Sequence, residues 1–327
     1  MGSPTISEQD LEQALKALVE VSKVEAFVSR SATPPADADL PQVNLLFARF
    51  REDSPDIEAL AEFLSMQVVN YVIPLKKRKE AVVAASKAAG GADASIFDRL
   101  VREARRMLIE LNLNSPSRAS EVGELLAYLV AQQWLGAFQL ASKMAIKTSA
   151  NMPIHGLDGI HARLEGGIMT LFFMESKLAG SAKNGMREFS KSISAFALNR
   201  KQYLLEYTII SDLSNLDSLK KAARLAALDY LDVYGPKKSH RIERPVGVIC
   251  YSEPLFNTKM AKSPTTTPQA HEDEFATRYR AEHAMHRLAF KKVLSAKKLG
   301  DGDASVWLMA VPDKDELRTL FYKSLAK

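Results

Sequence analysis

The chain has 327 residues, of which 46% are hydrophobic and 25% charged, and its formal net charge is +5. These values are ordinary for a globular protein with one large or two smaller domains. The single cysteine, Cys250, excludes an internal disulfide and a cysteine-rich zinc site. The first residues lack the pattern of a secretory signal and no apolar run reaches the length of a membrane span, so we expect a cytoplasmic protein with no membrane contact.

The first third of the sequence is predicted to be mainly helical. Ser7 is a suitable N-cap for a helix from residue 8 to 21, and helical patterns follow at residues 56–69, 75–89 and 93–113. Residues 44–50 predict one short strand. The segment 112–120 is rich in capping residues and contains Pro116. We therefore predict a mainly helical region over residues 1–113 and a second domain over residues 114–327.

The second part of the chain mixes strands with helices. Residues 121–147 predict one long apolar helix, and residues 157–165 and 167–178 predict two strands joined by a tight turn at Gly166–Gly167. Further strands are predicted at 244–253 and 304–312, and helices at 184–198, 217–231, 273–298 and from 313 to the end. This order predicts an α/β fold with a mixed central sheet flanked by helices on its faces.

Charged residues stand at an unusual place in the predicted hairpin. The strand 167–178 is apolar on both faces, yet it ends with Glu175 and Lys177. Such charges are costly to bury unless they are paired or bind a metal. Asp158 begins the adjacent strand, and antiparallel pairing brings these strand ends together. Alternation along the strand places Asp158 on the core side and His161 on the opposite, surface side.

These residues support a resemblance to a known family. Asp158 followed by Glu175-Ser176-Lys177, after a helix that carries glutamates, resembles the active site of the PD-(D/E)xK nuclease superfamily, although Leu157 stands where that motif has proline. More narrowly, "GLDGIHARLEGGIMTLFFMESKL", with "VWLMAVP" near the end, resembles HamA, the nuclease subunit of the Hachiman anti-phage defence system. The resemblance covers roughly residues 115–327.

The resemblance implies a role for each residue of the motif. Asp158 and Glu175 would be metal ligands together with the backbone carbonyl of Ser176, and such an all-oxygen set suits Mg²⁺ or Mn²⁺. Lys177 would orient the attacking water and stabilise the transition state.

A further metal ligand is expected from the helix that begins near residue 121. In the superfamily such a helix often supplies a glutamate, and we favour Glu124 because it lies further inside the helix than Glu121. The alternative is that both glutamates complement the positive end of the helix dipole.

Basic residues cluster around the motif. Between Lys143 and Lys201 there are nine Lys or Arg and four Asp or Glu, an excess that suits a polyanion such as nucleic acid. Lys183, Arg187 and Lys191 recur every four residues and predict a helical stripe along a DNA backbone, with Lys147 as a further contact. Solvated helix faces are the alternative.

The sequence as a whole predicts a Mg²⁺-dependent deoxyribonuclease. By resemblance, it would be the effector of a defence complex, and its partner helicase, HamB, would hold it inactive until phage or aberrant DNA is sensed. The helical first third is our candidate for docking the partner. Two alternatives stay open: an autonomous restriction or repair nuclease, and a non-catalytic interaction subunit whose carboxylates only form buried pairs.

Overall fold

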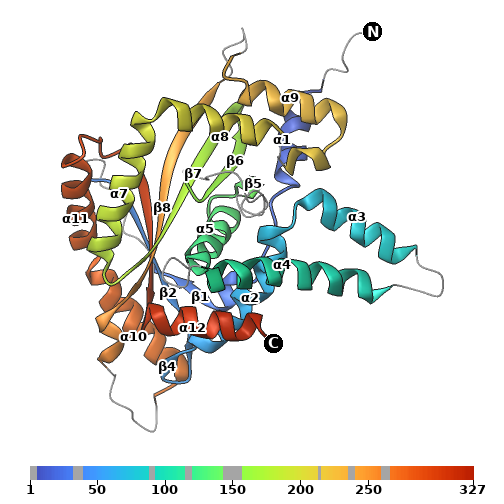
Figure 1. The fold of residues 1–327 in the computed structure, drawn as a ribbon. Helices are drawn as coiled ribbons and strands as arrows, with labels where there is room; N and C mark the ends of the chain where they lie inside the picture. Colours follow the sequence, from blue (N-terminus) through green and yellow to red (C-terminus); the bar gives the residue numbers. More distant parts are fainter. Residues whose placement is uncertain are drawn as a thin grey trace, which may run out of the picture.

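The protein is built around one mixed sheet. The computed structural model describes residues 6–31, 40–87, 93–114, 120–142, 157–212, 215–234, 240–258 and 266–327. Seven strands form the sheet in the order β1-β2-β9-β8-β7-β6-β5 (Figure 1). They span β1 Val28–Arg30, β2 Gln42–Ala48, β5 Phe138–Ser142, β6 Gly159–Glu165, β7 Ile168–Ala179, β8 Arg241–Ser252 and β9 Ser305–Val311. The predicted central mixed sheet is thus confirmed.

Strand direction changes across this sheet. Strands β2, β9, β8 and β7 run parallel, whereas β1–β2, β5–β6 and β6–β7 are antiparallel pairs. The β6–β7 hairpin turns at Gly166 and Gly167, whose φ angles of 54° and 74° glycine adopts without strain. A separate two-stranded ribbon pairs β3 Phe50–Arg51 with β4 Ser54–Pro55. The predicted hairpin and its turn are confirmed.

Helices cover both faces of the sheet. One apolar cluster packs α2, α4, α5 and α12 on one face, and a second packs α1, α7, α8, α9, α10 and α11 on the other. The helices span α1 Glu8–Lys16, α2 Ile57–Val72, α3 Leu75–Ser86, α4 Ala94–Asn114, α5 Glu121–Gln133, α7 Ala182–Leu198, α8 Arg200–Asp212, α9 Lys221–Leu231, α10 Pro268–Ala281, α11 His283–Ser295 and α12 Lys314–Leu325. Short 3₁₀ turns lie at Val24–Ala26, Asn215–Ser218 and Pro254–Asn257. Within the described ranges, no helix combines the length and apolarity that crossing a membrane requires.

The two longest predicted helices are not continuous in the structure. The predicted helix 121–147 ends at Gln133, and β5 follows as a strand paired with β6. Gly136, with φ of 58°, makes the turn between them. The predicted helix 273–298 is two helices, α10 and α11, which meet at Glu282.

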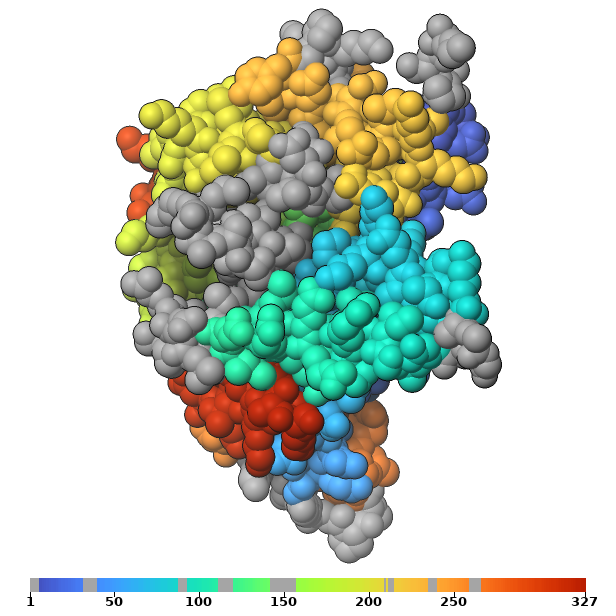
Figure 2. Space-filling view, turned by 45° about the vertical axis from the view of Figure 1, so that its right-hand side comes forward, coloured from blue at the N-terminus to red at the C-terminus, as the bar shows by residue number. Residues whose placement is uncertain are grey.

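The first third of the chain shares its core with the rest. It is mainly helical, as predicted, but it also supplies β1 and β2, and β2 pairs in parallel with β9. Helix α2 packs against α12 at the other end of the sequence, and α4 lies beside α12 on the same side of the molecule (Figure 2). The division between residues 113 and 114 therefore does not separate two hydrophobic cores. Helices α3 and α4 extend outward as a pair (Figure 1).

Candidate carboxylate–lysine site

The end of the β6–β7 hairpin brings the predicted acids together. Gly159 pairs with Met174, so Asp158 lies opposite Glu175. Asp158 N donates a hydrogen bond to Met174 O at 2.9 Å, while its Oδ2 accepts from Ser176 N and Ser176 Oγ, each at 2.7 Å. Asp158 lies in the bend before β6, where strand alternation no longer holds. The orientation of its carboxylate therefore follows from the hydrogen bonds to Ser176 of β7 and not from strand alternation.

Ser176 orients this carboxylate. In a strand, the N–H and C=O of one residue point to the same side. Because Ser176 N donates to Asp158, the Ser176 carbonyl also points toward the edge where β6 has ended. The carbonyl that was predicted as a backbone ligand thus lies on the same side of β7 as Asp158.

Glu175 and Lys177 form a largely buried ion pair. Lys177 Nζ lies 2.5 Å from Glu175 Oε1, and the two side chains are 21% and 7% exposed. Within the described part of the chain, Glu175 Oε2 accepts no hydrogen bond although it is buried. Glu175 borders a cavity of about 220 Å³ beneath α7 and α8, which Leu157 and Ser192 also line. A buried carboxylate oxygen without a donor is costly and suggests a missing partner.

The charge state of Lys177 follows from its neighbours. Burial lowers its pKa, but the carboxylates of Glu175, Asp158 and Glu188 together raise it by more, so the pKa is raised. Glu188 comes from α7, which places this helix beside the site. Lys177 therefore keeps its positive charge in this arrangement.

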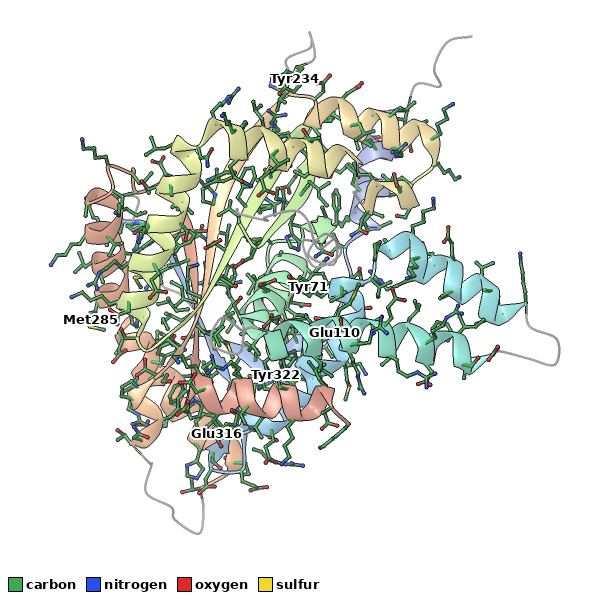
Figure 3. The ribbon with its side chains drawn as sticks, viewed as in Figure 1. Tyr71, Glu110, Tyr234, Met285, Glu316 and Tyr322 are labelled. Carbon is green, nitrogen blue, oxygen red and sulfur yellow. The ribbon has the colours of Figure 1, made fainter. Side chains whose placement is uncertain are left out.

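Helix α5 approaches the site closely at Gly123. A Cβ there would lie 2.8 Å from Leu178 Cδ1 and 3.1 Å from Ser176 Oγ. Glu124, the next residue, is buried and accepts hydrogen bonds from Tyr71 Oη at 2.6 Å and Ser120 Oγ at 3.1 Å. Tyr71 comes from α2 and lies in the interior (Figure 3). No local sequence signal distinguishes Tyr71 from the other buried residues of that helix.

Glu121, the alternative acid on α5, points elsewhere. Its Oε2 accepts a hydrogen bond from Tyr322 Oη at 2.5 Å. Tyr322 lies on α12 (Figure 3). The charge of Glu124 raises the pKa of Asp158. Glu124 is therefore the α5 glutamate that lies with the motif.

The site concentrates negative charge in a buried place. Burial, and then the charges of Glu175 and Glu124, raise the pKa of Asp158 to about 7, although the hydrogen bonds from Ser176 lower it. Asp158 thus lies within the field of two further carboxylates, while the ammonium group of Lys177 forms an ion pair with Glu175. A surplus of buried negative charge favours either a bound proton or a bound cation.

The donor set suits a divalent cation in its chemistry. It consists of oxygen atoms alone, which Mg²⁺ and Mn²⁺ prefer, and Glu175 Oε2 is a buried oxygen with no hydrogen-bond donor among the described residues. Over the same residues, no three His, Cys, Asp or Glu side chains already form a group that could hold a metal. Asp158 and Glu175 would therefore be the ligands, since both oxygens of Glu124 already accept hydrogen bonds.

The predicted basic stripe does not face the carboxylates as a unit. Lys183 and Arg187 line a groove between α7 and α11, whereas Glu188 and Ser192 lie on the side of α7 that borders Lys177 and Glu175. Lys191 is exposed. Lys147 lies outside the described residues. The predicted contact with a DNA backbone stays a prediction.

His161 is not at the surface, so that prediction is wrong. It is 2% exposed and packs near the ring of Tyr128, with ring centroids 6.0 Å apart. Burial lowers its pKa to about 3. Strand β6 is covered on both faces, so alternation did not separate core from solvent.

The fold and site together define an α/β protein with a mixed sheet, whose β6–β7 hairpin carries a buried carboxylate–lysine cluster at its open end. Comparison with family models matches residues 24–325 to HamA, so the chain belongs to the HamA family. It is accordingly a subunit of the Hachiman anti-phage defence system. A search of curated proteins finds no match.

Proposed function

We propose that this protein is a metal-dependent deoxyribonuclease and the effector of its Hachiman system. The supporting observation is the convergence of Asp158, Glu175 and Lys177, together with the unmatched oxygen Glu175 Oε2 among the described residues. A purely structural buried ion pair is usually accompanied by donors to the remaining carboxylate oxygen. This asymmetry favours a ligand site over the non-catalytic alternative.

Each residue has a distinct part in the proposed reaction. Asp158 and Glu175 hold the cation, which supplies Lewis-acid activation of the phosphodiester when it is bound. Ser176 fixes the Asp158 carboxylate through its N–H and hydroxyl groups. Lys177, held by Glu175, donates hydrogen bonds to the oxygen on which negative charge develops. Glu124, on α5, adds negative charge beside Asp158 and so favours a bound cation.

We also propose that a partner helicase, HamB, restrains the nuclease until phage or aberrant DNA is sensed. This part rests on membership of the HamA family. It predicts that the isolated chain cuts DNA in Mg²⁺ and that added helicase suppresses cutting. An autonomous nuclease would instead be indifferent to the helicase.

The test is plasmid cleavage by the purified chain in Mg²⁺, with and without the helicase. The double variant Glu175→Ala/Lys177→Ala is expected to abolish cleavage. Its matched control is Arg106→Ala/Glu110→Ala, which removes an exposed ion pair on α4 and should leave cleavage intact. Undiminished cleavage by the first variant contradicts the site, and the absence of any cleavage by the native chain under all conditions contradicts the function.

A further inference from the structure

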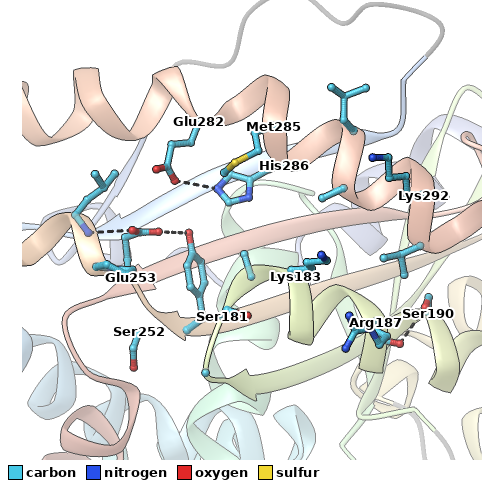
Figure 4. A pocket seen from close by; sticks show the side chains of 18 of the residues that line it. Ser181, Lys183, Arg187, Ser190, Ser252, Glu253, Glu282, Met285, His286 and Lys292 are labelled. Carbon is cyan, nitrogen blue, oxygen red and sulfur yellow. Dashed lines mark hydrogen bonds and ion pairs between the residues drawn. The ribbon is translucent and has the colours of Figure 1, made fainter.

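A second hollow lies on the other side of α7. A groove of about 1310 Å³ opens between the N-terminal half of α7 and α11, beyond the ends of β7 and β8 (Figure 4). Its lining includes Ser181, Tyr251 and Met285, and it shares no lining residue with the cavity around Glu175. We call this hollow the α7–α11 groove.

One wall of the α7–α11 groove is apolar. Met285 and Leu288 of α11 line it and are 55% and 51% exposed. Ala289 and Val293 extend the same wall, so the spacing follows one face of the helix. Leu255 adds to it from the 3₁₀ turn after β8. Adjacent large apolar side chains left in solvent mark an interaction surface.

Basic residues border this apolar wall from two helices. Lys183 and Arg187 come from α7, and Lys292 and Lys297 come from α11 or just beyond it. All four are exposed. Within the described ranges, no salt bridge involves any of them. The groove therefore offers positive charge on both sides of an apolar strip.

Two glutamates also line the groove. Glu253 is buried and accepts hydrogen bonds from Tyr251 Oη at 2.8 Å and Leu255 N at 3.0 Å. Glu282 lies 3.5 Å from His286 Nε2 (Figure 4). The negative charge of these two residues offsets the charge of the four basic residues only partly.

We infer that the α7–α11 groove docks an acidic amphipathic helix of a partner protein. Apolar residues of such a helix would cover Met285 and Leu288, and its carboxylates would face the lysines on either side. A nucleic acid fits less well, because a single strand needs exposed aromatic rings for stacking and phosphate contacts alone would leave Met285 and Leu288 uncovered. The lining rings are those of Tyr251 and His286, which are 2% and 6% exposed.

The groove is close enough to the carboxylate site for docking to affect it. Gly180 and Ser181 line the groove and directly follow the end of β7, three and four residues after Lys177. At the rise of an extended chain, the three residues from Lys177 to Gly180 span about 10 Å. The inference itself does not depend on nuclease activity, since docking is measured as binding.

The test uses fluorescence anisotropy with the full chain and a labelled probe peptide of about 18 residues. The peptide carries leucines at helical spacing on one face and glutamates elsewhere. It is expected to bind, and Leu288→Glu or the pair Lys183→Glu/Lys292→Glu should each weaken binding at least about tenfold. A peptide of the same composition with scattered leucines should bind at least about tenfold more weakly.

Matched controls separate docking from general charge and folding effects. Leu198→Glu changes an apolar side chain that is 85% exposed outside the groove, and Lys323→Glu reverses a charge on α12. Neither should alter peptide binding, and all variants should keep the native melting temperature. Absence of peptide binding, or equal binding by Leu288→Glu, would overturn the inference. Binding of a DNA oligonucleotide that depends on Lys183 and Lys292 but not on Leu288 would replace it with a nucleic-acid site.

Discussion

The two sides of helix α7 border hollows of opposite character. On one side, Glu188 lies near Lys177, and Ser192 lines a small cavity where Glu175 is buried. On the other, Lys183 and Arg187 border a groove several times larger, with exposed apolar and basic side chains. Burial shifts the ionisation of a charged group and suits it to chemistry. Exposure leaves charge hydrated and suits it to recognition. One helix thus separates a candidate reactive site from a candidate docking site.

The largest expected effect tests whether the buried side is the reactive one. Glu175→Gln should lower the rate of plasmid cleavage at least about 10²-fold, because it removes a charged ligand and the partner of Lys177. Glu124→Gln should cost only about tenfold, because the amide oxygen can still accept from Tyr71 or Ser120. Initial rates in Mg²⁺ measure both. A larger loss in Glu124→Gln would reverse the assignment of these two acids.

The next prediction concerns a substitution that would push α7 away from the sheet and so affect the hollows on both sides of this helix. A Cβ at Gly185 would lie 2.2 Å from Ile249 Cγ2 of β8, a buried side chain with little room to move. Gly185→Ala should therefore lower the free energy of unfolding by about 2 kcal/mol in urea denaturation. Gly302→Ala is the control, because no atom lies within 4 Å of its added Cβ. Equal stability of the two variants would show that α7 is not held tightly against the sheet.

The third prediction concerns the pH dependence of stability without metal. The pKa of Asp158 is raised from 3.8 to about 7, so the folded state binds an extra proton between these values, and stability falls as pH rises through this window. Asp158→Asn has no proton to lose, so its stability should not fall in this window. In EDTA at pH 8 the variant should be more stable than the native chain by about 1 kcal/mol or more, with the difference vanishing near pH 4.

An exposed aspartate supplies the control of opposite sign. A hydrogen bond from Lys314 lowers the pKa of Asp315 on α12. Asp315→Asn should therefore lose stability at pH 8 rather than gain it. Guanidinium titrations at several pH values measure both variants. A gain in Asp315→Asn equal to that of Asp158→Asn would mean that the effect reflects net charge and not burial.

The last prediction concerns stabilisation by the cation. Mg²⁺ at ten times its dissociation constant should stabilise the native chain by about 1.4 kcal/mol, seen as a rise of a few degrees in melting temperature. Glu175→Gln should lose this shift, and the groove variant Leu288→Glu should keep it. A shift that survives in Glu175→Gln would place the cation elsewhere.

Much of the hairpin site was predictable from the sequence. The Gly166–Gly167 turn sets the register of β6 and β7, and that register places Asp158 opposite Glu175. The prediction failed where a long apolar run shows neither helical nor strand periodicity, because such a run does not distinguish a helix from a strand. Residues 121–142 are apolar almost throughout, so the change from α5 to β5 was missed.

The sequence by itself determined the local partners: the hairpin, its turn, and the meeting of Asp158, Ser176, Glu175 and Lys177. These contacts lie within one hairpin, where spacing and strand geometry suffice. Only the tertiary structure decided that Tyr71 of α2 holds Glu124 of α5, and that α7 and α11 enclose a groove. Such contacts depend on how helices pack across the sheet, and packing joins residues far apart in the sequence that no local pattern relates.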